Sequence, residues 1–144
     1  MKCRAKLTYG ISPFCYVGGY MNKASVRSKK KLEGVDSRLV LLVGYALAIS
    51  PVDFFVNEGV RSEKKQKEYY KQGKSKCDGV VNRSKHQDGK AIDVYYVGWE
   101  SDDSLTDGRW YILIESFKKA GKMLGLKLRF GYDWGWDNPH IELR

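Results

Sequence analysis

The sequence predicts an α+β fold, a single domain in which helices pack on a small antiparallel sheet. Segments with helical periodicity and short segments rich in β-branched and aromatic residues follow one another without a repeating βαβ register. The 144 residues suit one domain, and a hydrophobic content of 42% is enough for a core. Residues 1–24 show no sustained period, so we expect an N-terminal extension of unknown role and then one domain over residues 25–144.

The first half of this domain is expected to hold three helices and one strand. Each helix begins at a side chain that can cap it, namely Ser25 or Ser28, Asp36 or Ser37, and Ser62. The expected elements are a basic helix through residue 32, an apolar helix that stops at residues 50–51, a strand over 53–60 and a polar helix over 62–72. A polar loop then runs to about residue 85.

The second half is expected to add three strands and one helix. In a strand over 90–97, Ile92 and Val94 point to one side of the pleat, whereas Asp93 and Tyr95 point to the other. The remaining expected elements are a helix over 107–124, a short strand over 126–130, an aromatic turn over 131–136 and a last strand through 143. The apolar side of that helix is predicted to consist of Ile112, Ile114, Phe117, Ala120 and Leu124.

Composition excludes some functional classes and leaves others open. The net charge of +9 favours anionic partners, which are nucleic acid, acidic lipid surfaces or bacterial cell-wall polymers. No apolar run reaches about 18 residues, so no membrane insertion is expected, and residues 1–20 lack the continuous apolar stretch of a signal peptide. The cysteines are Cys3, Cys15 and Cys77. An odd number without a C-x-x-C pair argues against a disulfide scaffold, although a bond between the first two stays open.

The only two histidines lie in sequence contexts that suit a metal site. A catalytic zinc ion needs three nitrogen or oxygen ligands and one open position for water. His86, Asp93 and His140 supply such a set, and Asp137 lies close enough in sequence to serve as a base. Plainer interpretations remain: the two aspartates would be a solvent-facing strand residue and a turn residue, and His140 would decorate the surface.

Other residues are candidates for supporting roles. Arg61 lies at a strand-to-helix junction, where a guanidinium can bind a substrate carboxylate or an oxyanion, or can simply be solvated. Ser84 can orient His86 or touch the substrate. Four aromatic residues are expected either to line the cleft or to belong to a plain aromatic core: Tyr95, Tyr132, Trp134 and Trp136.

These contexts resemble a known family of zinc enzymes, the VanX/VanY-like D-alanyl-D-alanine peptidases. The stretch from Ser84 to Asp93 matches the pattern S-x-H-x-x-G-x-A-x-D in full, and Asp137-x-x-His140 is similar to the family's acid-x-x-His element. Residues 59–62 are similar to its G-x-R-[ST] element, and residues 117–134 resemble more narrowly the L-alanyl-D-glutamate peptidases that bacteriophages use as endolysins. The likeness covers about residues 25–143 and implies a hedgehog/D-Ala-D-Ala peptidase-like fold.

The resemblance also implies a role for each candidate. His86, Asp93 and His140 would bind one Zn²⁺, Asp137 would be the general base and acid, and Arg61 would assist the transition state. Many relatives carry Glu where Asp137 stands, often followed by Trp-His, which makes the reach of the shorter side chain less certain. The phage endolysins of this type use Asp at that place, which favours the endopeptidase branch.

The function expected from the resemblance is hydrolysis of the L-alanyl-D-glutamate bond in bacterial peptidoglycan, leading to lysis of a phage's host. The expected enzyme is a monomer that stays in the host cytoplasm until a holin-type partner gives it access to the cell wall in the periplasm. Two alternatives stay open. The first is a D,D-carboxypeptidase or D-Ala-D-Ala dipeptidase with the same zinc-binding fold, and the second is a zinc-bearing binding domain without catalysis. No nucleic-acid partner is expected, because no recognition helix or RNA-binding motif is present.

Overall fold

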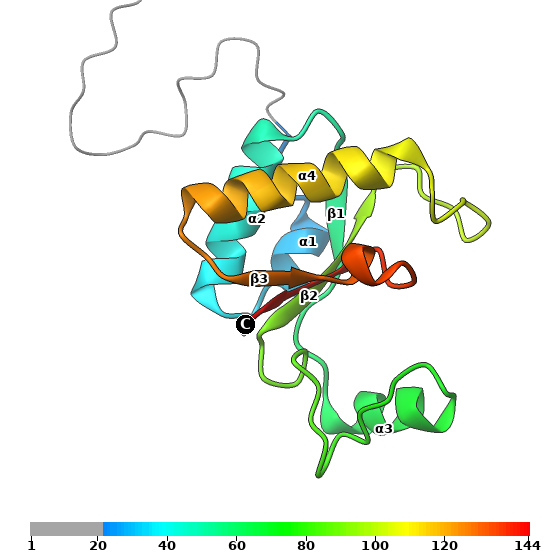
Figure 1. Ribbon diagram of the computed structural model, residues 1–144. Coiled ribbons are helices and arrows are strands. Elements are labelled where there is room, and N and C mark those ends of the chain that lie inside the picture. The colour runs from blue at the N-terminus through cyan, green and yellow to red at the C-terminus, as the bar shows by residue number, and fades with distance from the viewer. Residues whose placement is uncertain (1–21) are drawn as a thin grey trace, which may run out of the picture.

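The computed structural model describes residues 22–144 (Figure 1). Most of the predicted N-terminal extension, together with Cys3 and Cys15, therefore lies outside the described residues. The first described residue contacts the domain, since the Asn22 side-chain amide donates a 2.9 Å hydrogen bond to the Ser50 carbonyl oxygen. No helix among residues 22–144 is long and apolar enough to cross a membrane.

One four-stranded sheet forms the centre of the fold, with every neighbouring pair antiparallel. The strands are β1 (Phe54–Glu58), β2 (Ala91–Tyr96), β3 (Leu128–Phe130) and β4 (His140–Leu143), in the order β1-β2-β4-β3. The register pairs Asp93 with His140, so these two residues share one face of the sheet. The predicted antiparallel sheet is confirmed, and its strands are up to three residues shorter than expected.

The helices begin at the side chains that the sequence singles out. They are α1 (Val26–Lys31), α2 (Ser37–Ile49), α3 (Glu63–Lys71) and α4 (Gly108–Met123), with a short 3₁₀ helix, η1 (Gly131–Trp134), in the aromatic turn. The N-cap side chains of Ser25, Asp36, Ser62 and Asp107 each accept a hydrogen bond from a backbone N–H of the first helical turn. Local capping chemistry thus determines where each helix starts.

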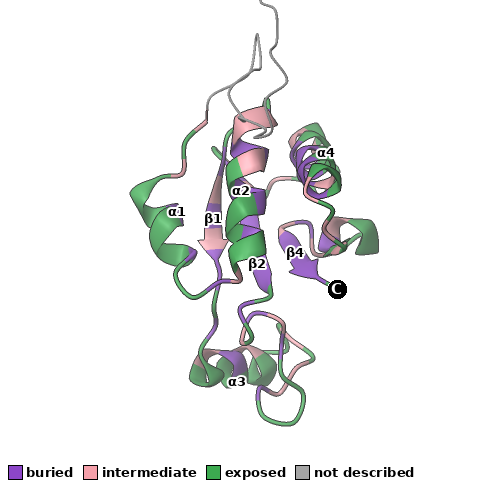
Figure 2. Ribbon diagram, turned by 90° about the vertical axis from the view of Figure 1, so that its left-hand side faces the viewer, coloured by how far each residue is buried: buried purple, intermediate pink, exposed green. Residues whose placement is uncertain are grey.

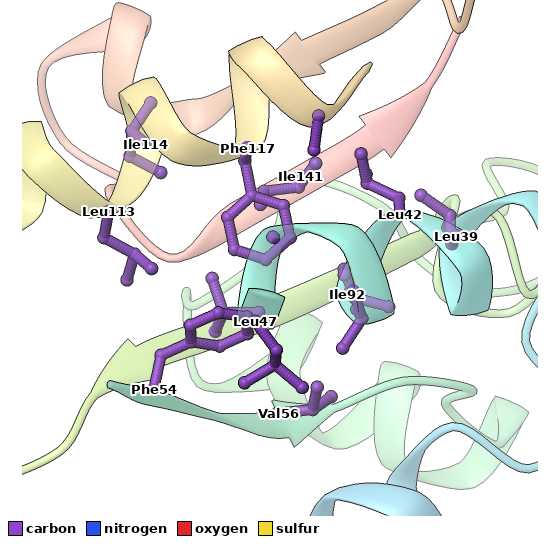
Figure 3. Close-up of a cluster of buried hydrophobic side chains, with 14 of the residues drawn as sticks. Leu39, Leu42, Leu47, Phe54, Val56, Ile92, Leu113, Ile114, Phe117 and Ile141 are labelled. Atoms are coloured by element: carbon purple, nitrogen blue, oxygen red, sulfur yellow. The ribbon is translucent and has the colours of Figure 1, made fainter. Parts of the chain in front are cut away.

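The core lies between the sheet and the two longest helices, α2 and α4 (Figure 3). Phe117 of α4 and Phe54 of β1 meet there, with ring centroids 5.0 Å apart. The predicted apolar side of α4 was partly wrong, because Ile112 is 39% exposed whereas Trp110 and Leu113 are buried. A helix turns by about 100° per residue, so a position two residues before the buried Ile114 points nearly away from the core.

The opposite face of the sheet carries polar side chains. Because side chains alternate along a strand, Ile92 and Ile141 point into the core, whereas Asp93 and His140 point away from it. The alternative in which His140 decorates the surface is wrong, because His140 is only 9% and its neighbour Glu142 only 7% exposed.

A lobe formed by α3 and the loop after it, residues 62–85, extends from the body of the domain (Figures 1 and 2). Most of its residues are exposed, although Gln66 is completely buried. The lobe follows directly on β1 and leads into the segment that carries His86. It therefore stands beside the polar face of the sheet.

Candidate metal centre and active site

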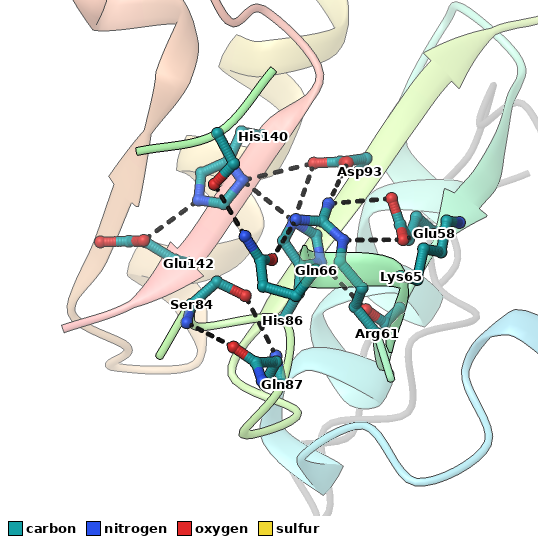
Figure 4. A network of polar contacts seen from close by, with 12 residues as sticks. Glu58, Arg61, Lys65, Gln66, Ser84, His86, Gln87, Asp93, His140 and Glu142 are labelled. Carbon is teal, nitrogen blue, oxygen red and sulfur yellow. Dashed lines mark hydrogen bonds and ion pairs between the residues drawn. The ribbon is translucent and has the colours of Figure 1, made fainter. Parts of the chain in front are cut away.

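His86, Asp93 and His140 meet on the polar face of the sheet, although 54 residues separate the two histidines (Figure 4). His86 comes from the turn before β2, Asp93 from the middle of β2, and His140 from the first position of β4. The histidines are nearly buried and the Asp93 side chain is 17% exposed, so the alternative in which Asp93 points freely into solvent is wrong.

The three donor atoms form an almost equilateral triangle. His86 Nε2 lies 3.2 Å from His140 Nδ1, and each of these nitrogens lies 3.3 Å from Asp93 Oδ1. In a tetrahedral centre with metal–ligand bonds of about 2.0–2.1 Å, two ligand atoms are separated by about 3.3 Å. The triangle therefore has the right size for one tetrahedral cation such as zinc.

The other nitrogen of each imidazole is held by an acceptor that sets the tautomer. His86 Nδ1 donates a 2.9 Å hydrogen bond to the Gly59 carbonyl oxygen, and His140 Nε2 donates a 3.0 Å hydrogen bond to the Glu142 carboxylate. The nitrogens that face each other then both present lone pairs. Two lone pairs and a carboxylate oxygen at these distances favour a cation between them, and such outer hydrogen bonds are usual for metal-binding histidines.

The electrostatics of the cluster also favour a cation. Burial by itself raises the pKa of Asp93, but the neighbouring His86 and His140 outweigh it and lower this pKa, so the carboxylate stays ionised. For His140, burial lowers the pKa, yet the carboxylates of Asp93 and Glu142 raise it to about 9. The anionic surroundings thus stabilise positive charge at the centre of the triangle, whether a proton or a metal ion carries it.

Asp137 lies in the turn between η1 and β4, near the cluster. Its backbone carbonyl accepts a 3.1 Å hydrogen bond from the His140 N–H, so Asp137 forms the turn, and the charges of Asp93 and His140 reach its side chain. Its side chain makes no hydrogen bond or ion pair with any residue from 22 to 144. Burial and the negative charge of Asp93 raise the pKa of Asp137. A half-buried, unpaired carboxyl group of this kind can accept and return a proton.

Arg61 is buried rather than solvated, being only 8% exposed, so the surface alternative for this residue is wrong. Its Nε and Nη2 donate hydrogen bonds of 2.9 Å each to the two oxygens of Glu58, and Nη1 donates one of 2.8 Å to the side chain of Gln66. The ring of Tyr69 lies 4.7 Å from the guanidinium carbon. Nη2 is also 3.9 Å from Asp93 Oδ2, which brings this cation to the edge of the donor triangle.

Gln66 ties the lobe to this arginine. Its side-chain oxygen accepts from Arg61, while its Nε2 donates to the Ser75 hydroxyl at 2.8 Å and to the Cys77 carbonyl at 2.7 Å. Every polar atom of this fully buried amide is thereby satisfied. The lobe is thus connected to the donor triangle through Gln66, Arg61 and Asp93.

Two further residues that the sequence suggested, Ser84 and Tyr95, lie near the donor triangle, and each has different neighbours. The backbone N–H of Ser84 donates to the Gln87 side chain at 2.9 Å, and the Ser84 hydroxyl also contacts Gln87 rather than the ring of His86. Tyr95 packs between Trp99 and Trp110 in an aromatic cluster, and burial together with the charge of Asp93 raises the pKa of Tyr95 to about 12.

Trp134 and Trp136 lie on the His140 side of the donor triangle, whereas Arg61 lies near Asp93. The Trp134 ring lies 5.4 Å from the His140 ring at an interplanar angle of 33°, and Trp136 lies 5.6 Å from Trp134. Trp134 is 36% exposed and Trp136 is 63% exposed. The plain aromatic core therefore explains Tyr95 but not this outward-facing pair.

Sequence reasoning missed three residues that hold the site together, namely Glu58, Gln66 and Glu142, and it included Gly59 in the element at residues 59–62 without giving it a role. Two of them carried a readable signal, because Glu142 shares a strand face with His140 two residues away, and Glu58 precedes Arg61 by three residues. Nothing in the sequence indicated the contacts made by the Gly59 carbonyl oxygen and the Gln66 side-chain amide, because these contacts depend on the path of the folded chain.

The fold and the site together define a class of protein, a hydrolase whose donor triangle can hold one metal ion beside an unpaired carboxyl group. The family model for the phage L-alanyl-D-glutamate peptidase matches residues 21–143, and the chain belongs to this family. It is 32% identical over 135 residues to the L-alanyl-D-glutamate peptidase of Escherichia phage T5, a match that covers 84% of this chain and 97% of the relative.

Two further likenesses agree with this assignment. The peptidoglycan L-alanyl-D-glutamate endopeptidase CwlK of Bacillus subtilis (strain 168) is 32% identical over 114 residues, which are 68% of this chain and 65% of that protein. The crystal structure of the Serratia marcescens L-Ala D-Glu endopeptidase ChiX superimposes with a TM-score of 0.69 at 31% identity and covers 83% of this chain and 87% of that one. The predicted family and fold class are confirmed.

We expect a Glu142→Gln variant to bind its metal ion about tenfold or more weakly, because the neutral amide no longer raises the basicity of His140 as the carboxylate does. Competition between the protein and a coloured chelator for Zn²⁺ measures the change. Glu100→Gln, at an exposed loop position, is the matched control and should leave the affinity unaltered. Equal affinities of the Glu142 variant and the control would contradict the orienting role of Glu142.

Proposed function

We propose that this protein is a zinc-dependent L-alanyl-D-glutamate endopeptidase that cleaves the stem peptides of bacterial peptidoglycan and acts as a phage endolysin. The observation that carries the proposal is the triangle of His86, Asp93 and His140, with edges of 3.2–3.3 Å, beside the unpaired carboxyl group of Asp137. Membership of the phage L-alanyl-D-glutamate peptidase family supports the choice of bond.

In this proposal His86 Nε2, Asp93 Oδ1 and His140 Nδ1 hold one Zn²⁺. A zinc ion in such a site lowers the pKa of water towards about 7 and polarises a carbonyl group. Asp137 accepts the proton of the attacking water and later delivers it to the departing amine of the D-glutamate residue. Its raised pKa suits both steps, because a weakly basic carboxylate becomes a better proton acceptor and remains able to donate.

Arg61 is proposed to stabilise the transition state. Three of its five N–H groups are taken up by Glu58 and Gln66, so one hydrogen on each Nη remains for the oxyanion or for a substrate carboxylate. Because the guanidinium is already fixed, little ordering is needed when substrate arrives. Ser84 is proposed to act indirectly, by bracing the turn that carries His86 through Gln87. Trp134 and Trp136 are proposed to line the substrate cleft, whereas Tyr95 is proposed to support its wall from the aromatic cluster with Trp99 and Trp110.

Membership of the phage peptidase family supports a proposal about the setting of this activity. We propose that the enzyme works as a monomer, accumulates in the cytoplasm of the host bacterium and reaches the peptidoglycan through a separate holin-type partner. The net charge of +9 would then favour contact with the anionic cell envelope.

Mass spectrometry of purified peptidoglycan tests the proposed activity. Digestion should release peptides that begin at D-glutamate; a zinc chelator should abolish this release, and added Zn²⁺ should restore it. Loss of terminal D-alanine alone would instead assign a D,D-carboxypeptidase or dipeptidase. Absence of any cleavage by protein with one bound Zn²⁺ would refute the enzymatic proposal and leave a zinc-bearing binding domain.

A further inference from the structure

Two very different walls flank the metal centre. On the β1 side stands the lobe with Arg61, and residues 62–85 carry eight Lys or Arg against three Asp or Glu. On the β3 side stand Trp134 and Trp136, which lie next to the metal-site residue His140. A substrate lying across the triangle therefore meets cations at one end and aromatic rings at the other.

Within residues 22–144, packing in the core of the domain does not account for the aromatic wall. Trp136 is 63% exposed and packs mainly against Trp134, which in turn is sandwiched between His140 and the guanidinium of Arg129, 5.5 Å from its ring. Water-exposed tryptophan is costly, and outward-facing aromatic residues are characteristic of binding surfaces. The position beside a metal-site histidine indicates that the surface meets the substrate.

The chemistry of the substrate indicates which part of it fits such a surface. On the amino side of the L-alanyl-D-glutamate bond lie one methyl side chain and the lactyl group of the muramic acid saccharide. On the other side lie D-glutamate and further residues with free carboxylates. The pyranose ring is the group that offers a flat apolar face for an indole ring, whereas the carboxylates suit the cationic lobe.

We propose that Trp136, supported by Trp134, is a subsite for the saccharide that carries the stem peptide. This inference rests on the proposed function and adds an orientation to it: the glycan lies on the β3 side and the acidic part of the peptide lies towards the lobe. The enzyme therefore prefers stem peptides that are still attached to glycan over the same peptides in free form.

Hydrolysis of two defined substrates tests the subsite. They are a disaccharide-linked stem peptide and the identical free peptide, each cleaved by the zinc-loaded wild type, by Trp136→Ala and by Trp136→Phe. Trp136→Ala should lower kcat/KM for the disaccharide substrate by about fivefold or more, mostly through KM, and should lower it by a clearly smaller factor for the free peptide. Trp136→Phe should recover part of the loss. Tyr111→Ala, which removes a 57% exposed ring from α4 on the far side of the sheet, is the matched control.

Equal losses on both substrates, or no loss on either, would overturn the subsite. A separate binding measurement keeps this result distinct from failure of the proposed function. Peptide-free glycan fragments should quench the tryptophan fluorescence of the wild type and should not quench that of Trp136→Ala. If the wild type cleaves neither substrate, the proposed bond is wrong, and the fluorescence result still decides whether Trp136 binds a saccharide.

Discussion

Replacement of His86 by alanine is expected to abolish both metal binding and peptidoglycan hydrolysis. His86 supplies one corner of the triangle, and two remaining ligands do not hold zinc at submicromolar concentrations of free metal. We expect the hydrolytic rate to fall by a factor on the order of 1,000 or more, because the loss of the ion removes both the acidified water and the polarised carbonyl. Elemental analysis after dialysis and release of soluble muropeptides measure the two effects.

A folding control is necessary because His86 is only 3% exposed and also donates to the Gly59 carbonyl oxygen. Wild-type protein stripped by a chelator should show the same inactivity with an intact near-ultraviolet circular dichroism spectrum. Its activity should return with Zn²⁺, whereas that of His86→Ala should not. An alanine variant that still binds one zinc ion and keeps its activity would remove His86 from the metal centre.

Asp137→Asn is expected to keep its zinc ion and still lose most of its activity. Asparagine has nearly the same shape, and Asp137 is not one of the three ligands, so metal content and folding should match the wild type. Loss of a general base and acid typically lowers a rate by about 100- to 10,000-fold, and the loss should appear in kcat. Steady-state hydrolysis of a defined muropeptide measures it. Full activity in a zinc-loaded Asp137→Asn variant would exclude the proposed proton transfer.

The pH dependence supplies a second test of Asp137. Its pKa is raised by burial and by the charge of Asp93, and only the ionised carboxylate can accept a proton. Wild-type activity should therefore be present above this pKa and fall as the pH drops through it. The residual activity of Asp137→Asn should lack that acid limb. The metal content has to be followed at each pH, since protonation of His140 also competes with the ion.

The local features of this chain are readable directly from its sequence. Capping side chains such as Asp36 and Ser62 predict where helices start, because they act on backbone groups two or three residues away. The alternation around Asp93 predicts a strand with one polar face for the same reason. The prediction was wrong where it had to state which side of a long helix faces the core. On α4, Ile112 was assigned to the core side that Trp110 and Leu113 occupy.

The sequence by itself determined the fold class, the family resemblance and the residue types that can bind a metal ion, since each of these depends on short patterns. Only the tertiary structure decided how the site is held. Pairing of β2 with β4 sets Asp93 opposite His140, and the path of the chain brings the Gly59 carbonyl oxygen to His86 across 27 residues. Such contacts depend on sheet register and packing between distant segments, which no local preference of the chain specifies.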